Sequence, residues 1–146
     1  MKITILSDEK AAETEIVITC ARLTPEIERL ICMLRIMDMK ITGSRDGEVY
    51  LLDAEEVLYA DSADKKTFLY TRDDVYESKL KLYELESQLK EAGFIRAGKS
   101  CIIHLRHIVS LKADLNRRIK VTLSNGEQLI VSRQYAEELK ARLGVK

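Results

Sequence analysis

The chain has 146 residues and a mass of 16.7 kDa, which corresponds to one domain of ordinary size. Hydrophobic residues make up 46% of it and charged residues 33%, a composition that excludes a disordered tail. No apolar run approaches the roughly 18 residues that a membrane span needs, and the N-terminus lacks the apolar core of a signal peptide. Three cysteines without C-x-x-C spacing favour a reducing compartment over a disulfide framework. We therefore expect a cytoplasmic chain that does not enter a membrane.

The charge is balanced overall but not along the chain. The 24 basic and 24 acidic residues give a formal net charge of zero. Residues 1–40 and 41–92 carry net charges of −1 and −6, whereas residues 93–146, with 11 basic and 4 acidic side chains, carry +7. A basic final third attracts polyanions, and an acidic remainder limits indiscriminate binding. The distribution indicates a partner that bears phosphates.

Residues 1–40 predict two strands and a helix. Ile3 and Ile5 alternate with polar neighbours, and residues 15–20 form a β-branched run, and both patterns are typical of strands. Thr24 then caps a helix that continues to about residue 39. The apolar stripe of this helix consists of Ile27, Leu30, Ile31, Leu34 and Met37. So short a β-β-α segment cannot form a secure core alone, and we expect it to pack on the rest of the chain or on a second copy.

The remainder of the chain is rich in short strands. After a turn cluster at 43–47, the apolar and β-branched runs predict strands at 49–52, 57–60, 67–70, 74–76, 94–96, 101–103, 108–111, 118–123 and 127–131. A polar loop is expected at 61–66 and helices at 77–92 and from Ser132 onward. Asn125-Gly126 between two alternating strands is a strong hairpin signal. The pattern predicts an α+β fold that is mostly β.

No catalytic or metal-binding pattern stands out in the sequence. It contains neither a phosphate-binding glycine loop nor the usual hydrolase and zinc-protease motifs. Cys101, His104 and His107 have a spacing that superficially resembles a metal site. However, residues three apart on a strand point to opposite faces, and a structural zinc site needs four ligands. We therefore expect no enzyme activity, no metal and no cofactor.

Several basic residues fall at the ends of predicted strands and helices. Lys65 and Lys66 precede one strand, Lys99 and Ser100 another, and Arg133 opens the last helix. Any one of them could be an ordinary solvated charge. Together they suggest loops that a rigid β scaffold presents to a polyanion.

Three separated segments, residues 52–62, 94–108 and 123–135, resemble the LytTR family of bacterial DNA-binding domains in the right order and spacing. The resemblance covers about residues 45–146. It departs from the family pattern at Gly98, which loosens the loop of Lys99, and at His104, where the family usually has Asn. Many such domains follow the receiver domain of a response regulator. The preceding 40 residues are too few for a receiver, so the chain resembles the stand-alone LytTR regulators.

The resemblance implies an elongated, mostly antiparallel β fold that places loops in successive major grooves of double-stranded DNA. We accordingly expect a sequence-specific, response-regulator-like transcriptional regulator, with residues 41–146 as the DNA-binding domain and residues 1–40 forming a homodimer. Carried over by position, the base-contacting residues are Lys66, Lys99 and Arg133. Candidates for contacts to DNA phosphates are Arg96, Ser100, Lys112, Arg117, Arg118 and Lys140. The alternative is a protein-interaction module on the same scaffold that does not bind DNA.

Overall fold

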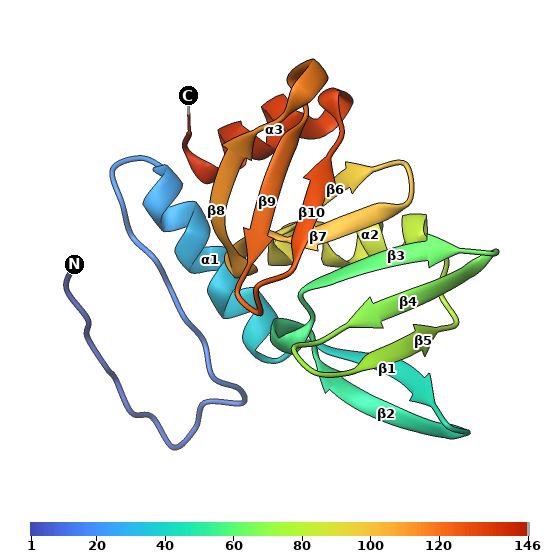
Figure 1. The fold of residues 1–146 in the computed structure, drawn as a ribbon. Helices are drawn as coiled ribbons and strands as arrows, with labels where there is room; N and C mark the ends of the chain where they lie inside the picture. Colours follow the sequence, from blue (N-terminus) through green and yellow to red (C-terminus); the bar gives the residue numbers. More distant parts are fainter. Residues whose placement is uncertain (146) are drawn as a thin grey trace.

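The structure, a computed structural model, describes residues 1–145, which form three α-helices and ten β-strands (Figure 1). Four 3₁₀ turns connect them. In chain order the elements are α1 (Pro25–Met37), β1 (Lys40–Arg45), β2 (Glu48–Asp53), η1 (Ala54–Glu56), β3 (Tyr59–Ala63), β4 (Lys66–Tyr70), β5 (Val75–Ser78), α2 (Leu82–Leu89), η2 (Lys90–Ala92), β6 (Phe94–Gly98), β7 (Cys101–His104), η3 (Leu105–His107), β8 (Ile108–Ala113), η4 (Leu115–Arg117), β9 (Ile119–Leu123), β10 (Gln128–Val131) and α3 (Arg133–Leu143).

The strands form two antiparallel sheets. Seven of them make one sheet in the order β2-β1-β5-β4-β3-β7-β6, and the other three make a sheet in the order β10-β9-β8. Figure 1 shows the three-stranded sheet and α3 on one side of β6 and β7, and β1 to β5 on the other. The expected fold class, mostly antiparallel β with a few helices, is confirmed.

Each sheet contributes to its own hydrophobic core. The first core lies between α2, the end of α1 and the seven-stranded sheet, and the second between α3, the three-stranded sheet and β6. Strand β7 belongs to both, because Ile102 is buried in the first core and its neighbour Ile103 in the second. A strand with both faces buried is apolar at successive positions, which explains the unbroken run at 101–103.

The first 24 residues differ from the expectation. The two strands predicted around Ile3 and at residues 15–20 are not formed, and Figure 1 shows this segment as a long irregular trace beside α1. A strand is stabilised by hydrogen bonds to a neighbouring strand, and no other part of the described chain pairs with this segment. By contrast, α1 forms as predicted, and the Thr24 hydroxyl accepts a hydrogen bond from the Ile27 backbone N–H at 3.3 Å.

The cluster at 43–47 is mostly strand rather than turn. Strand β1 runs through it, and the turn to β2 is confined to Asp46 and Gly47, both with positive φ. Glycine is required at position 43 because a Cβ there would lie 2.7 Å from the Cβ of Tyr76 on β5. The close approach of two strands, which the local sequence does not reveal, explains the error.

Two further boundaries were wrong for the same kind of reason. The loop expected at 61–66 shortens to a two-residue turn, Asp64 and Lys65, because β3 and β4 pair as far as Ala63 and Lys66. The helix expected from Glu77 begins only at Leu82, since Glu77 lies on β5 opposite Phe68 of β4. The hairpins at residues 67–78 and 119–131 are confirmed.

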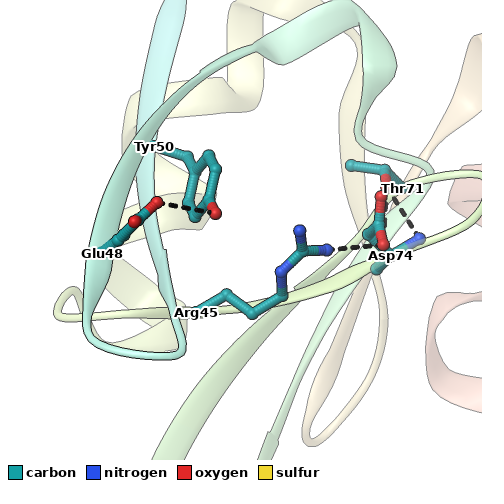
Figure 2. Close-up of polar contacts among 5 residues, drawn as sticks. All are labelled: Arg45, Glu48, Tyr50, Thr71 and Asp74. Carbon is teal, nitrogen blue, oxygen red and sulfur yellow. Dashed lines mark hydrogen bonds and ion pairs between the residues drawn. The ribbon is translucent and has the colours of Figure 1, made fainter.

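A polar cluster fastens the β1–β2 hairpin to the β4–β5 turn. Figure 2 shows the Arg45 guanidinium reaching from β1 to the Asp74 carboxylate at 2.5 Å, while the Tyr50 hydroxyl donates to the Glu48 carboxylate at 3.0 Å. The same guanidinium lies 5.3 Å and 5.0 Å from the ring centres of Tyr50 and Tyr76. Arg45 is therefore engaged within the fold.

Candidate nucleic acid interface

Two hairpin turns lie side by side at one end of the seven-stranded sheet. One is the β3–β4 turn at Asp64 and Lys65, and the other is the β6–β7 turn at Lys99 and Ser100. Strands β3 and β7 are antiparallel neighbours, and the Ser62 backbone N–H donates to the Ser100 carbonyl oxygen at 2.9 Å. This hydrogen bond holds the two turns next to each other.

The start of α3 is attached to the same end. The backbone N–H of Ser132, the N-cap residue, donates to the Ala97 carbonyl oxygen on β6 at 2.9 Å. The Ser132 hydroxyl makes no capping hydrogen bond, so this residue anchors the helix through its backbone. As a result Arg133, the first residue of α3, lies beside the strand that leads to Lys99. Backbone hydrogen bonds thus gather the segments of all three residues expected to contact bases.

The three side chains differ in their surroundings. Lys99 and Arg133 are exposed and form no ion pair with the described part of the chain. Lys66 is the first residue of β4 rather than a loop residue, and its ammonium lies 3.6 Å from the Glu77 carboxylate. Both groups of that pair are well exposed, so the interaction is weak.

Arg96 is less available than its neighbours. Its side chain is only 17% exposed and pairs with the Glu86 carboxylate of α2 at 3.2 Å. It also donates to the Lys99 carbonyl oxygen at 3.2 Å, across an irregularity in the pairing of β6 and β7. In the structure, Arg96 therefore supports the turn that presents Lys99.

The other candidates for phosphate contact fall in two places. Ser100 is exposed in the β6–β7 turn, next to Lys99. The rest surround the connection between β8 and β9 and the later turns of α3, namely Lys112, Arg117, Arg118 and Lys140. Lys65, which the sequence assigned only to a loop, occupies the tip of the β3–β4 turn with φ +66°. The length of that turn, which only strand pairing reveals, is what places Lys65 there.

His104, His107 and Cys101 are engaged within the fold, whereas Cys20 is exposed. Nδ1 of His104, which is 1% exposed, donates to the Val57 carbonyl oxygen at 3.1 Å, and its ring stacks on Phe94. Burial, and after it the charge of His107, lowers the pKa of His104 to about 4. Nε2 of His107 donates to the Glu55 carbonyl oxygen at 2.6 Å. Burial raises the pKa of the Cys101 thiol to about 12. No group of three metal-ligating side chains occurs within residues 1–145.

A β scaffold that gathers exposed cations on turns at one end is typical of proteins that bind nucleic acids. Residues 47–144 match the family model described as the LytTr DNA-binding domain. The chain belongs to this LytTR family.

Individual proteins resemble the chain over different lengths. It is 28% identical to an "uncharacterized HTH-type transcriptional regulator" of Staphylococcus aureus strain MSSA476, over 99% of both chains, and 27% identical to a protein of the same description from strain NCTC 8325. A solved structure described as the "LytTr DNA-binding domain of putative methyl-accepting/DNA response regulator from Bacillus cereus" matches with a TM-score of 0.68 and 28% identity, over 72% of this chain and 96% of that one. "HTH" denotes a helix-turn-helix, but in residues 1–145 strands separate the three α-helices along the sequence.

Proposed function

We propose that this LytTR protein is a transcriptional regulator that reads double-stranded DNA through Lys66, Lys99 and Arg133. The observation that carries this assignment is the pair of backbone hydrogen bonds, from Ser62 to Ser100 and from Ser132 to Ala97, which gathers three cationic segments at one end. Lysine and arginine are the usual readers of guanine O6 and N7 in the major groove. No observation favours the alternative, an interaction module without DNA binding.

Arg133 makes the sequence-specific contact in this proposal. Its guanidinium projects from the first turn of a helix that is anchored to β6, and a fork of donors suits bidentate contact with a guanine edge. The backbone N–H groups of the same turn favour a neighbouring phosphate. Ser100, Lys112, Arg117, Arg118 and Lys140 contribute phosphate contacts, and Arg96 acts mainly by holding the Lys99 turn.

The test compares Arg133→Ala with Arg72→Ala. Arg72 is an exposed arginine of the β4–β5 turn, at the opposite end of β4, so its variant loses the same charge elsewhere. We expect Arg133→Ala to weaken binding to the operator by about 1–3 kcal/mol and to relax the preference at one base pair. Arg72→Ala should bind like the wild type. Equal loss in both variants, measured on specific and random duplexes, would contradict a reading role for Arg133.

Salt dependence measures the phosphate contacts separately. The logarithm of the affinity should fall with the logarithm of the salt concentration, with a slope of about −0.9 for each phosphate contacted. A flat titration would contradict the electrostatic contribution of the basic final third.

No helix within residues 1–145 is long and apolar enough to span a membrane. A cytoplasmic location remains part of the proposal.

The regulator acts as a homodimer joined through residues 1–40. Ile3, Ile5 and Leu6 are 77–89% exposed, which is an unusual concentration of apolar surface for a free chain. The α1 residues of the predicted apolar stripe are only partly covered: Ile27, Leu30, Ile31 and Leu34 are half-buried and Met37 is exposed. The hollow of about 350 Å³ between residues 16–18 and α1 is lined mainly by isoleucine and leucine.

A second copy can supply what this segment lacks. Residues 15–20 form a β-branched run without a strand partner, and an antiparallel twin would provide one. Antiparallel pairing centred between Val17 and Ile18 would place Arg22 of one copy opposite Glu13 of the other, with Glu15 as its diagonal neighbour. The two paired strands would then cover the apolar stripes of the two α1 helices.

Sedimentation of the full chain tests the dimer. Ile16→Asp should convert a micromolar dimer to a monomer because it places a charge between the segment and α1. Val109→Asp on β8 is the matched control, since Val109 is 64% exposed and Ile16 63%. A wild-type chain that sediments as a monomer would contradict the dimer while leaving DNA binding by a single copy open to measurement.

A further inference from the structure

A second basic site lies at the end of α3 that is far from Arg133. It is a hollow of about 460 Å³ between the β8–β9 connection and the later turns of α3. Lys140 lines it and follows Arg133 by seven residues, which is about 10 Å along a helix. The hollow is therefore separate from the turns that carry Lys66 and Lys99.

The charges around the hollow are not balanced within the chain. Four cations line it, and two carboxylates offset only part of their charge, through long ion pairs from Arg118 to Asp114 at 3.7 Å and from Lys140 to Glu137 at 3.8 Å. The remaining cations, Lys112 and Arg117, have no carboxylate within 4.0 Å in the described part of the chain.

Two features of the chain around these cations are unfavourable in the free protein. Lys112 of β8 stands directly opposite Lys120 of β9, an arrangement of like charges that destabilises a pair of strands. Asn116 and Arg117 adopt consecutive positive φ angles of 58° and 63°, a left-handed conformation that Asn tolerates and Arg rarely adopts. A bound anion would offset the charge of Lys112 and Arg117, which both line the hollow.

The walls of the hollow show what kind of anion fits. Leu111, Ile119 and Val145 form an apolar part beside the cations. A concave site with an apolar wall and a few convergent charges is typical of small-molecule sites, and its volume falls in their usual range. The phosphate backbone of a duplex is convex and would reach the cations at the rim without filling the hollow.

We propose that this hollow binds a small phosphorylated molecule with an apolar part, and that this ligand competes with the DNA backbone for Lys112 and Arg117. The competition rests on the proposed function, in which the same cations contact DNA phosphates. Binding of the ligand alone does not depend on it. Because coupling between two ligands is reciprocal, a bound ligand would lower the affinity for DNA and DNA would lower the affinity for the ligand.

Calorimetric titration of the full chain without DNA tests the site. The probe is phenyl phosphate, and inorganic phosphate serves as the probe without an apolar part. Phenyl phosphate should bind saturably and more tightly than inorganic phosphate. The double variant Lys112→Ala/Arg117→Ala should weaken this binding about tenfold or more, because two charge-assisted contacts are lost. The control, Arg72→Ala/Lys79→Ala, removes the same charge from exposed positions and should bind like the wild type.

A second arm measures DNA in the presence of phenyl phosphate. The probe should weaken duplex binding by the wild type and have little effect on the Lys112→Ala/Arg117→Ala variant. No saturable binding of phenyl phosphate, or equal binding by both double variants, would overturn the proposal. If the double variant loses only DNA affinity, the phosphates come from the duplex, which overturns the small-molecule site but not the proposed function. If the probe binds but DNA does not, the proposed function fails and the site remains.

Discussion

The first 24 residues and the sheet region from Lys40 onward contain the same strand-forming residue types, but only the sheet region forms strands. Both contain β-branched residues, yet Ile3 lies exposed in an irregular segment while Ile102 lies fully buried in β7. Strand β7 has β3 on one side and β6 on the other, whereas the N-terminal segment has no strand beside it in residues 1–145. The comparison shows that β-branched residues identify a segment able to form a strand, and that a neighbouring backbone decides whether it does.

The largest difference between the two regions should come from isoleucine truncation. Ile102→Ala should lower the free energy of unfolding by about 2–5 kcal/mol, because it leaves a cavity in the first core. Ile3→Ala should change it by no more than about 0.5 kcal/mol, since Ile3 is 77% exposed. Chemical denaturation at low protein concentration measures both. A large loss for Ile3→Ala would mean that the N-terminal segment already packs on the sheet region of the same chain.

The next effect concerns pH and is confined to the sheet region. The pKa of His104 is lowered from 6.5 to about 4 in the folded chain, so below about pH 6.5 the unfolded chain binds a proton that the folded chain does not. The stability attributable to neutral His104 is complete above pH 6.5 and is lost as the pH falls towards 4, by up to about 3 kcal/mol.

The variant His104→Asn isolates this contribution, because the amide can still donate to the Val57 carbonyl oxygen but does not titrate. Denaturation measured from neutral pH down to about pH 4 should show a shallower loss of stability in the variant. Parallel profiles for the two proteins would show that His104 is protonated equally in the folded and unfolded chains.

Two glycines of the sheet region provide a smaller and more local comparison. Gly43→Ala should cost about 1–3 kcal/mol, because the new Cβ would lie 2.7 Å from the Cβ of Tyr76. Gly98→Ala meets no atom within 4 Å and needs no unusual backbone, so its melting temperature should stay within the range of neutral surface changes. Equal melting temperatures for the two variants would mean that β1 and β5 separate easily, which would make the hairpin resemble the N-terminal segment.

The smallest expected loss of stability concerns the N-cap residues of two helices. Thr24→Ala should destabilise α1 by about 1 kcal/mol, because the Thr24 hydroxyl accepts a hydrogen bond from Ile27. Ser132→Ala should cost less, since the Ser132 hydroxyl makes no capping bond and the backbone bond to Ala97 survives the change. Denaturation followed by circular dichroism resolves the pair. The opposite order would show that the α1 cap does not persist in solution.

Much of the fold could be predicted from residues whose effect is local. Thr24 and Pro25 begin α1, Asn125-Gly126 joins β9 to β10, and Leu82, Leu85 and Leu89 mark the buried face of α2. The family followed from three separated segments of sequence, and the expectation that it binds DNA came with the family. These features depend on neighbouring residues or on side chains at fixed spacing, so a sequence without coordinates contains them.

Tertiary structure decided what depends on contacts between distant parts of the chain. Gly43 lies in a strand because Tyr76 approaches it, and Glu77 lies in a strand because Phe68 pairs with it. The backbone bond from Ser132 to Ala97 determines which turn Arg133 lies beside, and the packing of α3 beside the β8–β9 connection places Lys140 and Arg117 around the same hollow. The sequence determined which segments could be strands, helices and charged turns. Only the packing of those segments determined which charges meet, because hydrogen bonds between remote strands set those distances.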